Sequence, residues 1–327
     1  MQKLKLIVDT DIGDDIDDAF ALALLFQMPE VEILGVTTVY RNAFLRAKIA
    51  SHLAQLCGQN IPVYVGEDTP LNDPIEWFAF EKADADGKPL IGHYDDSMRH
   101  APIARGNAAD FILQQAERFP GQITVLALGP MTNLARAYFK APETFRKIGR
   151  IHMMGGDAFY PTREWNLRCD TDAAAAIFAS GVPITMIGYN VTNACRFNEA
   201  DIAFIDTLRS AGNRLLAAMM HTWMENNHFQ KPPVMHDGLA AACLAENFCD
   251  FVSLPIVLQM DEMRGRTVVA PEKHMQATQM RVAVSVDRDA FIAFLKDRLG
   301  RAEQILIDRE EHYERTGQGA RAGGGHS

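Results

Sequence analysis

The sequence predicts an α/β fold: a mostly parallel open sheet with helices on both faces and an added helical annex. Short runs of β-branched and aliphatic residues alternate with longer segments of helical periodicity over much of the chain, which is the pattern of βαβ units. The length of 327 residues is sufficient for one large α/β domain. Strands joined through helices in this way form a sheet covered on both faces.

The first part of the chain supplies the expected sheet. Aliphatic or β-branched runs predict strands at Leu4–Val8, Val31–Thr38, Ile61–Val65, Ile123–Leu128, Ile151–Met154 and Ile184–Ile187. Between them, apolar residues at helical spacing predict helices at Ala19–Met28, Phe44–Cys57, Ala108–Phe119, Leu134–Lys140 and Ala173–Ser180. The connections are expected to be right-handed crossovers.

The later part of the chain is expected to form the annex. The pattern is helical from Asn198 to Asn227, and a further helix begins near Gly238. An extended segment at Phe251–Gln259 precedes a hairpin around Arg264–Gly265. We expect a single domain over residues 1–315 and a disordered tail at 316–327. Two irregular stretches, 67–102 and 155–171, have the length of functional or mobile loops.

Composition excludes several classes of function. Lys and Arg number 32 against 42 Asp and Glu, a net charge of −10, and no basic run suits nucleic acid. The apolar run Ala19–Phe26 spans eight residues, far below the roughly 20 that cross a bilayer, so no membrane partner is expected. The N-terminus lacks the pattern of a signal peptide. Five scattered cysteines without a CxxC motif indicate reduced thiols, and we expect a cytoplasmic protein.

A cluster of acidic residues follows the first expected strand. Such a loop lies where open α/β sheets bind ligands. Acids in a first helical turn stabilise it by about 0.3–1 kcal/mol each, whereas neighbouring carboxylates repel by about 3 kcal/mol per pair at an effective dielectric constant near 20. A bound cation relieves this repulsion, and all-oxygen ligation favours Ca²⁺ or Mg²⁺. The six residues are Asp9, Asp11, Asp14, Asp15, Asp17 and Asp18.

An alternative interpretation concerns the sequence Asp9-Thr10-Asp11 after an apolar strand. The same arrangement occurs in phosphatases of the haloacid-dehalogenase type, in which the first Asp is the nucleophile. In that case Asp9 attacks the phosphoryl group. The rest of the chain decides between the two interpretations.

A set of further motifs carries a resemblance to a known family. The run Leu6–Gly13, followed by Asp17-Asp18-Ala19, resembles the signature of the inosine–uridine type nucleoside hydrolases, which are calcium-dependent N-ribohydrolases. Matches covering residues from about 4 to 240 follow in the family's order: Gly35-Val36-Thr37-Thr38 leading to Asn42, Gly129-Pro130-Met131-Thr132-Asn133, Met154-Gly155-Gly156, Glu164-Trp165-Asn166, Asn190-Val191-Thr192 and His236-Asp237.

The resemblance implies a Ca²⁺ site and an acid–base pair. Asp11 is implied to ligate the ion and to take a proton from a metal-bound water, and His236 to protonate the leaving base. Asp18, Asp237 and the backbone carbonyl of Leu128 are implied as further ligands. Two extra residues separate Gly13 from the Asp pair, which leaves Asp15 as an alternative to Asp18 for the bidentate ligand.

The resemblance also implies a ribose pocket. Asn42, Glu164 and Asn166 are implied to hold the ribose hydroxyls, with Asp17 reaching the same hydroxyls, Met154 lining the pocket and His93 on the side of the base. Carboxamides and carboxylates select ribose because a deoxy analogue leaves them unpaired. The loop from Gly156 to Glu164 is about four residues shorter than usual and lacks the expected Asn, which leaves the substrate's identity open.

Other residues keep two interpretations. Trp223, His228 and Phe229 either stack on a base or belong to the core. A His-Asp pair before a helix is often a cap, and Asn133 beside Thr132 is expected to be one.

We therefore expect hydrolysis of ribonucleosides to base and ribose, in purine or pyrimidine salvage, with a preference for hypoxanthine or pyrimidine bases suggested by His236. The family's homodimers and homotetramers imply an oligomer here. A protein that binds ribose or a nucleoside without turnover, because of the shortened loop, is the alternative from another class.

Overall fold

The computed structural model describes residues 3–76, 83, 87, 90–226, 232–271, 275 and 277–316. In these ranges nine strands form one sheet in the order β3-β2-β1-β4-β5-β6-β9-β7-β8. Six parallel strands follow the chain as predicted: β1 (Leu4–Thr10), β2 (Val31–Thr38), β3 (Val63–Val65), β4 (Ile123–Ala127), β5 (Arg150–Met154) and β6 (Ile184–Ile187).

Three later strands extend the sheet at one edge. β9 (Thr278–Val286) pairs in parallel with β6. β7 (Cys249–Leu258) is antiparallel to β9 and to β8 (Thr267–Val269), which confirms the hairpin around Arg264. β9 was not predicted, because its exposed and buried residues are mixed along the strand. The predicted mostly parallel α/β sheet is confirmed.

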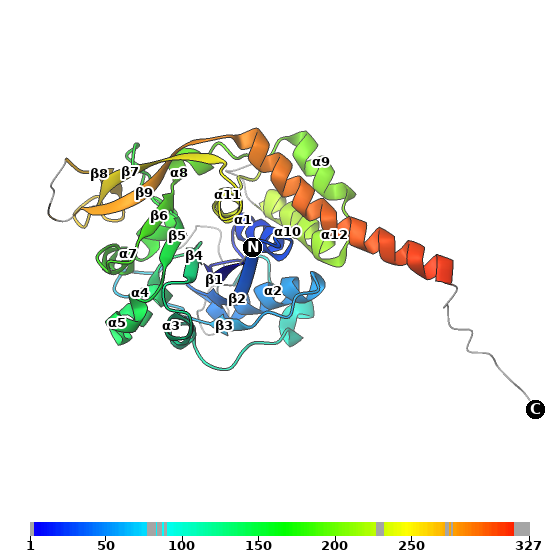
Figure 1. The fold of residues 1–327 in the computed structure, drawn as a ribbon, viewed down its shortest axis with the longest axis horizontal. Helices are drawn as coiled ribbons and strands as arrows, with labels where there is room; N and C mark the ends of the chain where they lie inside the picture. The colour runs from blue at the N-terminus through cyan, green and yellow to red at the C-terminus, as the bar shows by residue number, and fades with distance from the viewer. Residues whose placement is uncertain are drawn as a thin grey trace, which may run out of the picture.

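Helices pack on both faces of the sheet (Figure 1). One face carries α1 (Asp17–Phe26), α2 (Ala43–Leu56), α10 (Ala211–Asn226), α11 (His236–Ala242) and the first turns of α12 (Arg288–Thr316). The other carries α3 (Ala108–Arg118), α4 (Thr132–Lys140), α5 (Pro142–Phe145) and α7 (Thr171–Phe178). Along β1, Leu6 and Val8 join the first core and Ile7 the second, because successive side chains of a strand point to opposite faces.

The remaining helices are short or belong to the annex. They are the 3-10 helix η1 (Asp96–His100), α6 (Trp165–Cys169), α8 (Tyr189–Thr192) and α9 (Glu199–Thr207). The predicted helical stretch from Asn198 to Asn227 forms two helices, α9 and α10, because the chain is not helical at 208–210. Trp223 is buried in the core, which settles its role as packing, whereas His228 and Phe229 lie outside the described residues.

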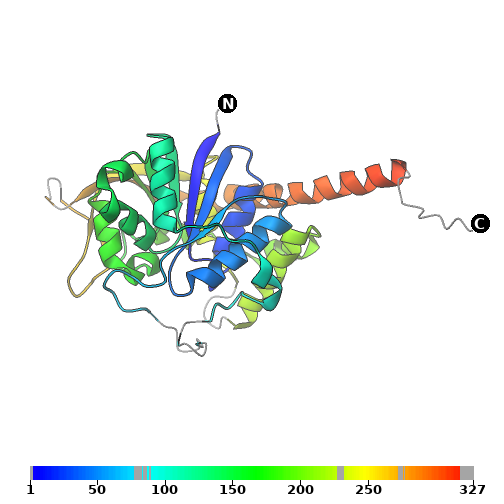
Figure 2. The same ribbon diagram turned by 90° about the horizontal axis from the view of Figure 1, so that it is seen from below.

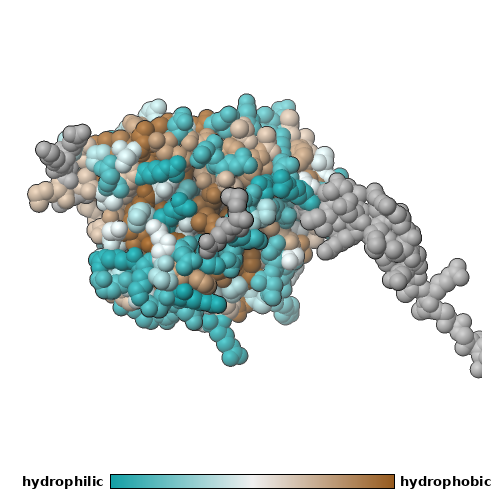
Figure 3. All heavy atoms as spheres, viewed as in Figure 1, coloured by the Kyte–Doolittle hydropathy of each residue, from teal (hydrophilic) through white to brown (hydrophobic). Residues whose placement is uncertain are grey.

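The C-terminal helix α12 was not predicted. Its first turns bury Phe291, Ile292, Leu295 and Leu299, and the helix then projects well beyond the body of the molecule (Figure 2). It ends at Thr316, the first residue of the expected tail, and residues 317–327 lie outside the described ones. Within the described part of the chain, none of the helices has both the length and the apolar character needed to span a bilayer. On the face seen in Figure 3, hydrophobic and hydrophilic residues are interspersed.

The strand order has its topological switch point between β1 and β4. From β1 the chain adds β2 and β3 on one side, and then crosses to β4, β5 and β6 on the other. At such a switch point, the loops that follow neighbouring strands run in opposite directions and leave a crevice at the carboxyl ends. The acidic loop that follows β1 and Leu128, which follows β4, both lie at this edge.

Candidate active site

The acidic loop runs from the end of β1 to the start of α1. The helix begins at Asp17, two residues before the expected Ala19, and its N-cap residue Ile16 provides no side-chain hydrogen bond. Asp17 and Asp18 are therefore in the first turn, where the helix dipole favours negative charge.

Three buried carboxylates meet between α1 and α11. Asp17, Asp18 and Asp237 each offer an oxygen, and these oxygens all lie within 4.8 Å of one another. The main-chain N–H of Asp237 donates to Asp17 Oδ2 at 3.0 Å, and the hydroxyl of Thr10 donates to Asp18 Oδ1. The packing of two helices thus joins residues that are 220 positions apart in the sequence.

Burial and mutual repulsion govern the charge of this trio. Burial raises the pKa of Asp17, Asp18 and Asp237 well above the usual 3.8, and the charges of the neighbouring carboxylates raise it further. Buried like charges at this spacing are costly without a counter-ion. The set of hard oxygen donors therefore fits a divalent cation such as Ca²⁺ or Mg²⁺.

Asp11 and Asp15 lie beside the trio. The charge of Asp11 contributes to the raised pKa of Asp18 and Asp237, and that of Asp15 to the raised pKa of Asp17. Burial raises the pKa of both Asp11 and Asp15 to about 6. Asp15 Oδ1 accepts a hydrogen bond from the N–H of Ile16 at 2.7 Å and is not among the three clustered carboxylates.

Gly129 gives Asp11 its space. A Cβ at this position would lie 2.8 Å from Asp11 Oδ1, closer than van der Waals contact allows. The glycine that follows β4 and Leu128 is therefore required by the close approach of Asp11.

Asp9 belongs to the interior of the sheet. It is fully buried, and its Oδ1 accepts hydrogen bonds from Thr37 Oγ1 at 2.5 Å and from Asn133 Nδ2 at 2.7 Å. Burial raises its pKa to about 7. A carboxylate enclosed in this way is not accessible to a phosphate ester, so the phosphatase interpretation, which needs Asp9 as nucleophile, has no support in the structure.

Asn133 connects Asp9 to two neighbouring segments. Its amide also donates to the carbonyl of Thr38 at 3.0 Å, and its Oδ1 accepts from the N–H of Glu67 at 2.9 Å. The expectation that Asn133 is a helix cap is wrong, because the N-cap of α4 is Met131.

Asp14 is held by two buried arginines. Its Oδ2 lies 2.6 Å from Arg46 Nη2 and 3.3 Å from Arg41 Nη1. Burial alone raises the pKa of Asp14, but the two guanidinium groups outweigh this and hold it below the usual value. Arg46 also donates to the main-chain carbonyls of Asp11, Ile12 and Tyr40, and so fixes the acidic loop against the start of α2.

The predicted ribose-binding residues lie at the ends of several elements. Glu164 caps α6, because its carboxylate accepts hydrogen bonds from the N–H groups of Asn166 and Leu167, and it also accepts one from Gly156 at 3.1 Å. Asn42 caps α2 by accepting from the N–H of Leu45 at 3.2 Å. Both are buried.

Asn166 joins the ends of β4 and β5. Its Nδ2 donates to the carbonyl of Leu128 at 2.6 Å and to that of Met154 at 3.2 Å. The structure therefore brings together one residue predicted to bind ribose and the carbonyl predicted to bind metal. A carbonyl oxygen has two lone pairs, so the hydrogen bond leaves one available for a cation.

His236 is the first residue of α11 and precedes Asp237. Its Nδ1 lies 2.7 Å from Thr192 Oγ1, and its ring stacks on Tyr189 with 5.6 Å between ring centroids. Burial, followed by the charge of Arg196, lowers the pKa of His236 to about 4. The capping interpretation is not supported, since the N-cap of α11 is Met235 and makes no side-chain hydrogen bond.

His93 lies beside the acidic loop, as its N–H donates to the carbonyl of Gly13 at 2.9 Å. Burial lowers the pKa of His93 to about 4, although Asp14 opposes this shift. Its Nδ1 is buried and has no hydrogen-bond partner among the described residues.

Sequence reasoning missed Thr10, Arg46 and Thr192. Thr192 falls in the Asn190-Val191-Thr192 motif, which is part of the family resemblance, but no role was assigned to any residue of that motif. Arg46 carries no such signal, because an arginine on an amphipathic helix is ordinarily a surface residue.

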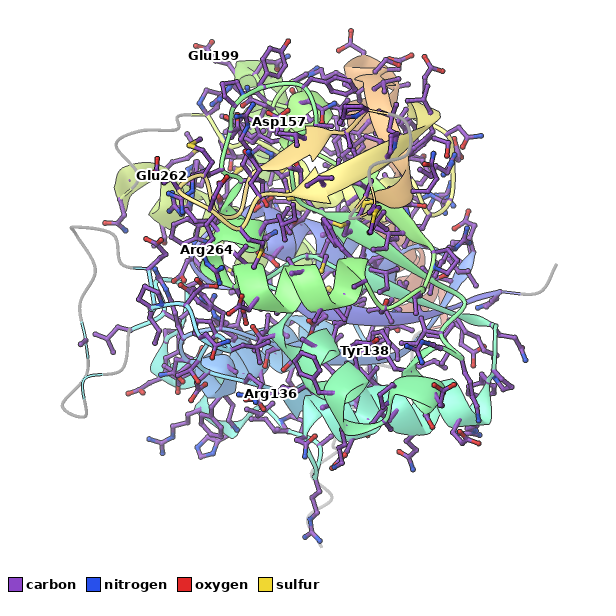
Figure 4. The ribbon with its side chains drawn as sticks, turned by 90° about the vertical axis from the view of Figure 1, so that its left-hand side faces the viewer. Arg136, Tyr138, Asp157, Glu199, Glu262 and Arg264 are labelled. Carbon is purple, nitrogen blue, oxygen red and sulfur yellow. The ribbon has the colours of Figure 1, made fainter. Side chains whose placement is uncertain are left out.

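A second group of charges attaches the β7–β8 hairpin to two neighbouring segments. Arg264, labelled in Figure 4, lies in the turn between β7 and β8. Its guanidinium group binds Asp73 at 2.7 Å and Asp172 at 2.7 Å. These contacts attach the hairpin to the loop that follows β3 and to α7.

Comparisons with known proteins identify the family. Residues 6–293 match the family described as inosine-uridine preferring nucleoside hydrolase. Probable uridine nucleosidase 2 of Arabidopsis thaliana is 31% identical over 322 residues, covering 90% of this chain and 97% of that protein. Non-specific ribonucleoside hydrolase RihC of Klebsiella pneumoniae is 31% identical over 304 residues, covering 88% and 96%. Uridine nucleosidase 1 of Arabidopsis thaliana is 34% identical over 66% of this chain, and the match spans 65% of that protein, just under two thirds.

Solved structures of nucleoside hydrolases resemble this chain over nearly their whole length. A plant nucleoside hydrolase superposes with a TM-score of 0.76 at 28% identity, covering 91% of this chain and 99% of that one. A purine-preferring ribonucleoside hydrolase from Gardnerella vaginalis has a TM-score of 0.75 at 26% identity, covering 92% and 99%. The chain therefore belongs to the inosine-uridine preferring nucleoside hydrolase family and is an enzyme that hydrolyses the N-glycosidic bond of ribonucleosides.

Proposed function

We propose that this protein releases free base and ribose from ribonucleosides with Asp11 as general base, His236 as general acid and Ca²⁺ as the metal. The observation that carries the proposal is the buried trio of Asp17, Asp18 and Asp237 beside Asp11 at the switch point of the sheet. Cleavage of this bond passes through a state resembling an oxocarbenium ion. Water is therefore required on one face of the sugar, and a proton or hydrogen bond at the departing base.

The proposed metal ligands are Asp11, Asp18, Asp237 and the carbonyl of Leu128. Ca²⁺ accepts six to eight oxygens in flexible geometry, which suits carboxylates from a loop and two helices. The clustering of Asp18 with Asp237 supports Asp18 over Asp15 as the bidentate ligand. When bound, the ion would lower the pKa of a water in its coordination shell.

Asp11 is suited to act as the base. Burial raises the pKa of Asp11 to about 6. At neutral pH its carboxylate is therefore ionised and still accepts a proton effectively. Gly129 leaves its Oδ1 uncrowded at the end of β4. Arg46 fixes the position of its main chain through the carbonyl.

His236 is suited to act at the leaving base. Its lowered pKa makes the free ring neutral at pH 7, so the ring gives the departing base a hydrogen bond from its single N–H. Transfer of a full proton requires the imidazolium form, which the charge that develops on the departing base would favour. When the hydroxyl of Thr192 donates to Nδ1, the proton is held on Nε2, the atom that would donate to the departing base. Stacking on Tyr189 keeps the ring in one plane.

Ribose recognition is proposed for Asn42, Glu164, Asn166 and Asp17, with Met154 lining the pocket and His93 on the side of the base. Their burial supports this role, because buried polar groups left unpaired by a deoxy sugar cost about 1–3 kcal/mol each. The relatives' names include uridine nucleosidases, a non-specific hydrolase and a purine-preferring one. We propose a preference for hypoxanthine or pyrimidine nucleosides and a role in purine or pyrimidine salvage.

Five unbridged cysteines support a reducing, cytoplasmic setting for the enzyme. The homodimer or homotetramer implied by the family resemblance stays a prediction.

A test measures reducing-sugar release from a panel of ribonucleosides, each with and without a calcium chelator. We expect turnover of at least one ribonucleoside, its loss in chelator and its recovery on adding Ca²⁺. The deoxy counterparts should react far more slowly. Nucleoside binding without sugar release would instead support a non-catalytic binder, and phosphate release from sugar phosphates would support a phosphatase. Turnover that is indifferent to chelator would exclude the metal-dependent mechanism.

A further inference from the structure

Two thiols lie close together at opposite ends of the loop that joins α11 to β7. Cys243 is the C-cap residue of α11, and Cys249 is the first residue of β7. Their sulfur atoms are 3.8 Å apart, and both are free thiols. A disulfide bond is about 2.0 Å long, so a local approach of less than about 2 Å would join them. The sequence had given no reason to assign chemistry to either residue.

The two thiols differ in their readiness to ionise. The hydrogen bond between the two thiols, helped by one from the N–H of Phe248 and by the charge of Arg281, lowers the pKa of Cys243 despite its burial. The same hydrogen bond and burial raise the pKa of Cys249. The thiolate is the nucleophile in disulfide exchange, and Cys243 is partly exposed whereas Cys249 is buried. Cys243 is therefore suited to attack first and Cys249 to complete the bond.

The proximity of the two sulfurs, together with the exposure of Cys243, distinguishes this pair from the other cysteines. Cys243 is partly exposed, and Cys249 lines a surface groove of about 580 Å³ together with Asn247, Asp250 and Ser285. Cys169 and Cys195 are fully buried. Cys57 is partly exposed, but its sulfur packs against Gly212 and burial raises its pKa to about 12.

We propose that Cys243 and Cys249 are a redox-active dithiol that a small disulfide such as oxidised glutathione converts into an intramolecular disulfide. The thiolate of Cys243 attacks one sulfur of the glutathione disulfide, whose S–S bond breaks and releases one glutathione thiolate. Cys249 then loses its proton to solvent and attacks the Cys243 sulfur of the mixed disulfide, releasing the second glutathione. The protein loses two electrons and two protons, and the oxidant becomes two molecules of glutathione.

The new bond would lie on the helix that carries the active-site pair. α11 begins with His236 and Asp237 and is seven residues long, so Cys243 lies about 10 Å from them along the axis. The proposal itself does not depend on the metal or on the nucleoside.

The experiment treats the reduced full-length protein with oxidised glutathione and then counts thiols after denaturation. We expect the loss of two of the five thiols, a mass lower by two hydrogens, a peptide linking Cys243 to Cys249, and full reversal by dithiothreitol. Cys249→Ser should stop at one glutathione adduct on Cys243. Cys57→Ser, as the matched control at another partly exposed thiol, should still lose two thiols.

Two results would overturn the proposal: retention of all five thiols, or the same loss of two thiols in Cys249→Ser. Native alkylation of the unmodified protein gives a measurement that needs no variant. We expect iodoacetamide to label Cys243 at least tenfold faster than Cys57, and equal rates would remove the basis for Cys243 as the attacking thiol.

Discussion

The Nη2 atom of Arg46 lies 2.6 Å from Asp14 Oδ2, and this ion pair fixes the acidic loop to α2. The same guanidinium group donates to the carbonyls of Asp11 and Ile12. Arg46 is almost completely buried, so its charge is compensated by the loop that it holds. The position of the proposed base therefore depends on a residue of α2 that is not itself a member of the trio of carboxylates.

Arg46→Ala should destabilise the protein by about 3–5 kcal/mol, because it leaves the partly buried Asp14 with Arg41 alone and removes the donor to three main-chain carbonyls. Urea denaturation measures the free energy of unfolding. Arg118→Ala, at an exposed position of α3, is the control and should change stability by less than about 0.5 kcal/mol. A similar change in both variants would mean that the ion pair does not hold the loop.

Asp11→Asn should lower kcat by about 10²–10⁴-fold, the usual contribution of a positioned acid–base group. The melting temperature of the metal-free protein should stay the same or rise, since the substitution removes a charge that raises the pKa of Asp18 and Asp237. Steady-state sugar release with saturating Ca²⁺ provides the measurement. A rate within a few-fold of the unmodified enzyme would exclude Asp11 as the base.

His236→Ala should slow natural nucleosides much more than an activated nitrophenyl riboside, because a good leaving group does not need protonation. Thr192→Val should show the same selectivity with a smaller loss, since it removes only the partner of Nδ1. Comparing kcat on the two substrates tests both variants. Equal losses on both substrates would indicate that His236 only positions the ligand.

Asp18→Asn should abolish stabilisation by Ca²⁺, whereas Asp15→Asn should retain most of it. The reason is that Asp18 clusters with Asp17 and Asp237, and Asp15 does not. Thermal melts over a Ca²⁺ titration give the apparent affinity of each variant. The reverse order of effects would assign the bidentate position to Asp15.

The rise in melting temperature caused by Ca²⁺ should grow as the pH increases from 5 to 8. The folded-state pKa values of Asp17, Asp18 and Asp237 lie above the unfolded value near 3.8. Between those values the native state binds more protons than the unfolded state, so the metal-free protein loses stability as pH rises. The cation compensates for the charges that form.

Histidines shift stability in the opposite direction. Burial lowers the pKa of His93 and His236 to about 4. Their contribution to the free energy of unfolding is therefore fully present above about pH 6.5 and is lost as the pH falls towards 4. This contribution is common to samples with and without Ca²⁺ and cancels in the difference between them. If the rise in melting temperature caused by Ca²⁺ did not change with pH, the carboxylates would not be the site that binds Ca²⁺.

The parallel core of the fold was predictable because its strands are short runs rich in aliphatic and β-branched residues, such as Leu6–Val8. The elements that sequence reasoning missed have weaker local signals: β9 is half exposed, and α12 has only a few buried residues in its first turns. The break between α9 and α10 carries no proline, so periodicity alone ran through it.

The candidate site was predictable to the extent that it follows motifs. Asp11, Asp18, Asp237 and His236 each fall in one, and the structure brings Asp18 and Asp237 together. The separate roles of Asp9 and Asp14 were not accessible, because they depend on Thr37, Asn133 and Arg46, which approach from other elements. A count of acidic residues cannot distinguish a buried structural carboxylate from one that faces a ligand.

The contact between Asp17 and Asp237 across 220 positions has a consequence for synthesis of the protein. A nascent chain that has emerged only as far as β6 contains the acidic loop but not the carboxylate that completes the trio. Until α11 has been synthesised, Asp17 and Asp18 lack the third carboxylate of the trio. In the mechanism proposed here, the cation site is therefore complete only after α11 has left the exit tunnel.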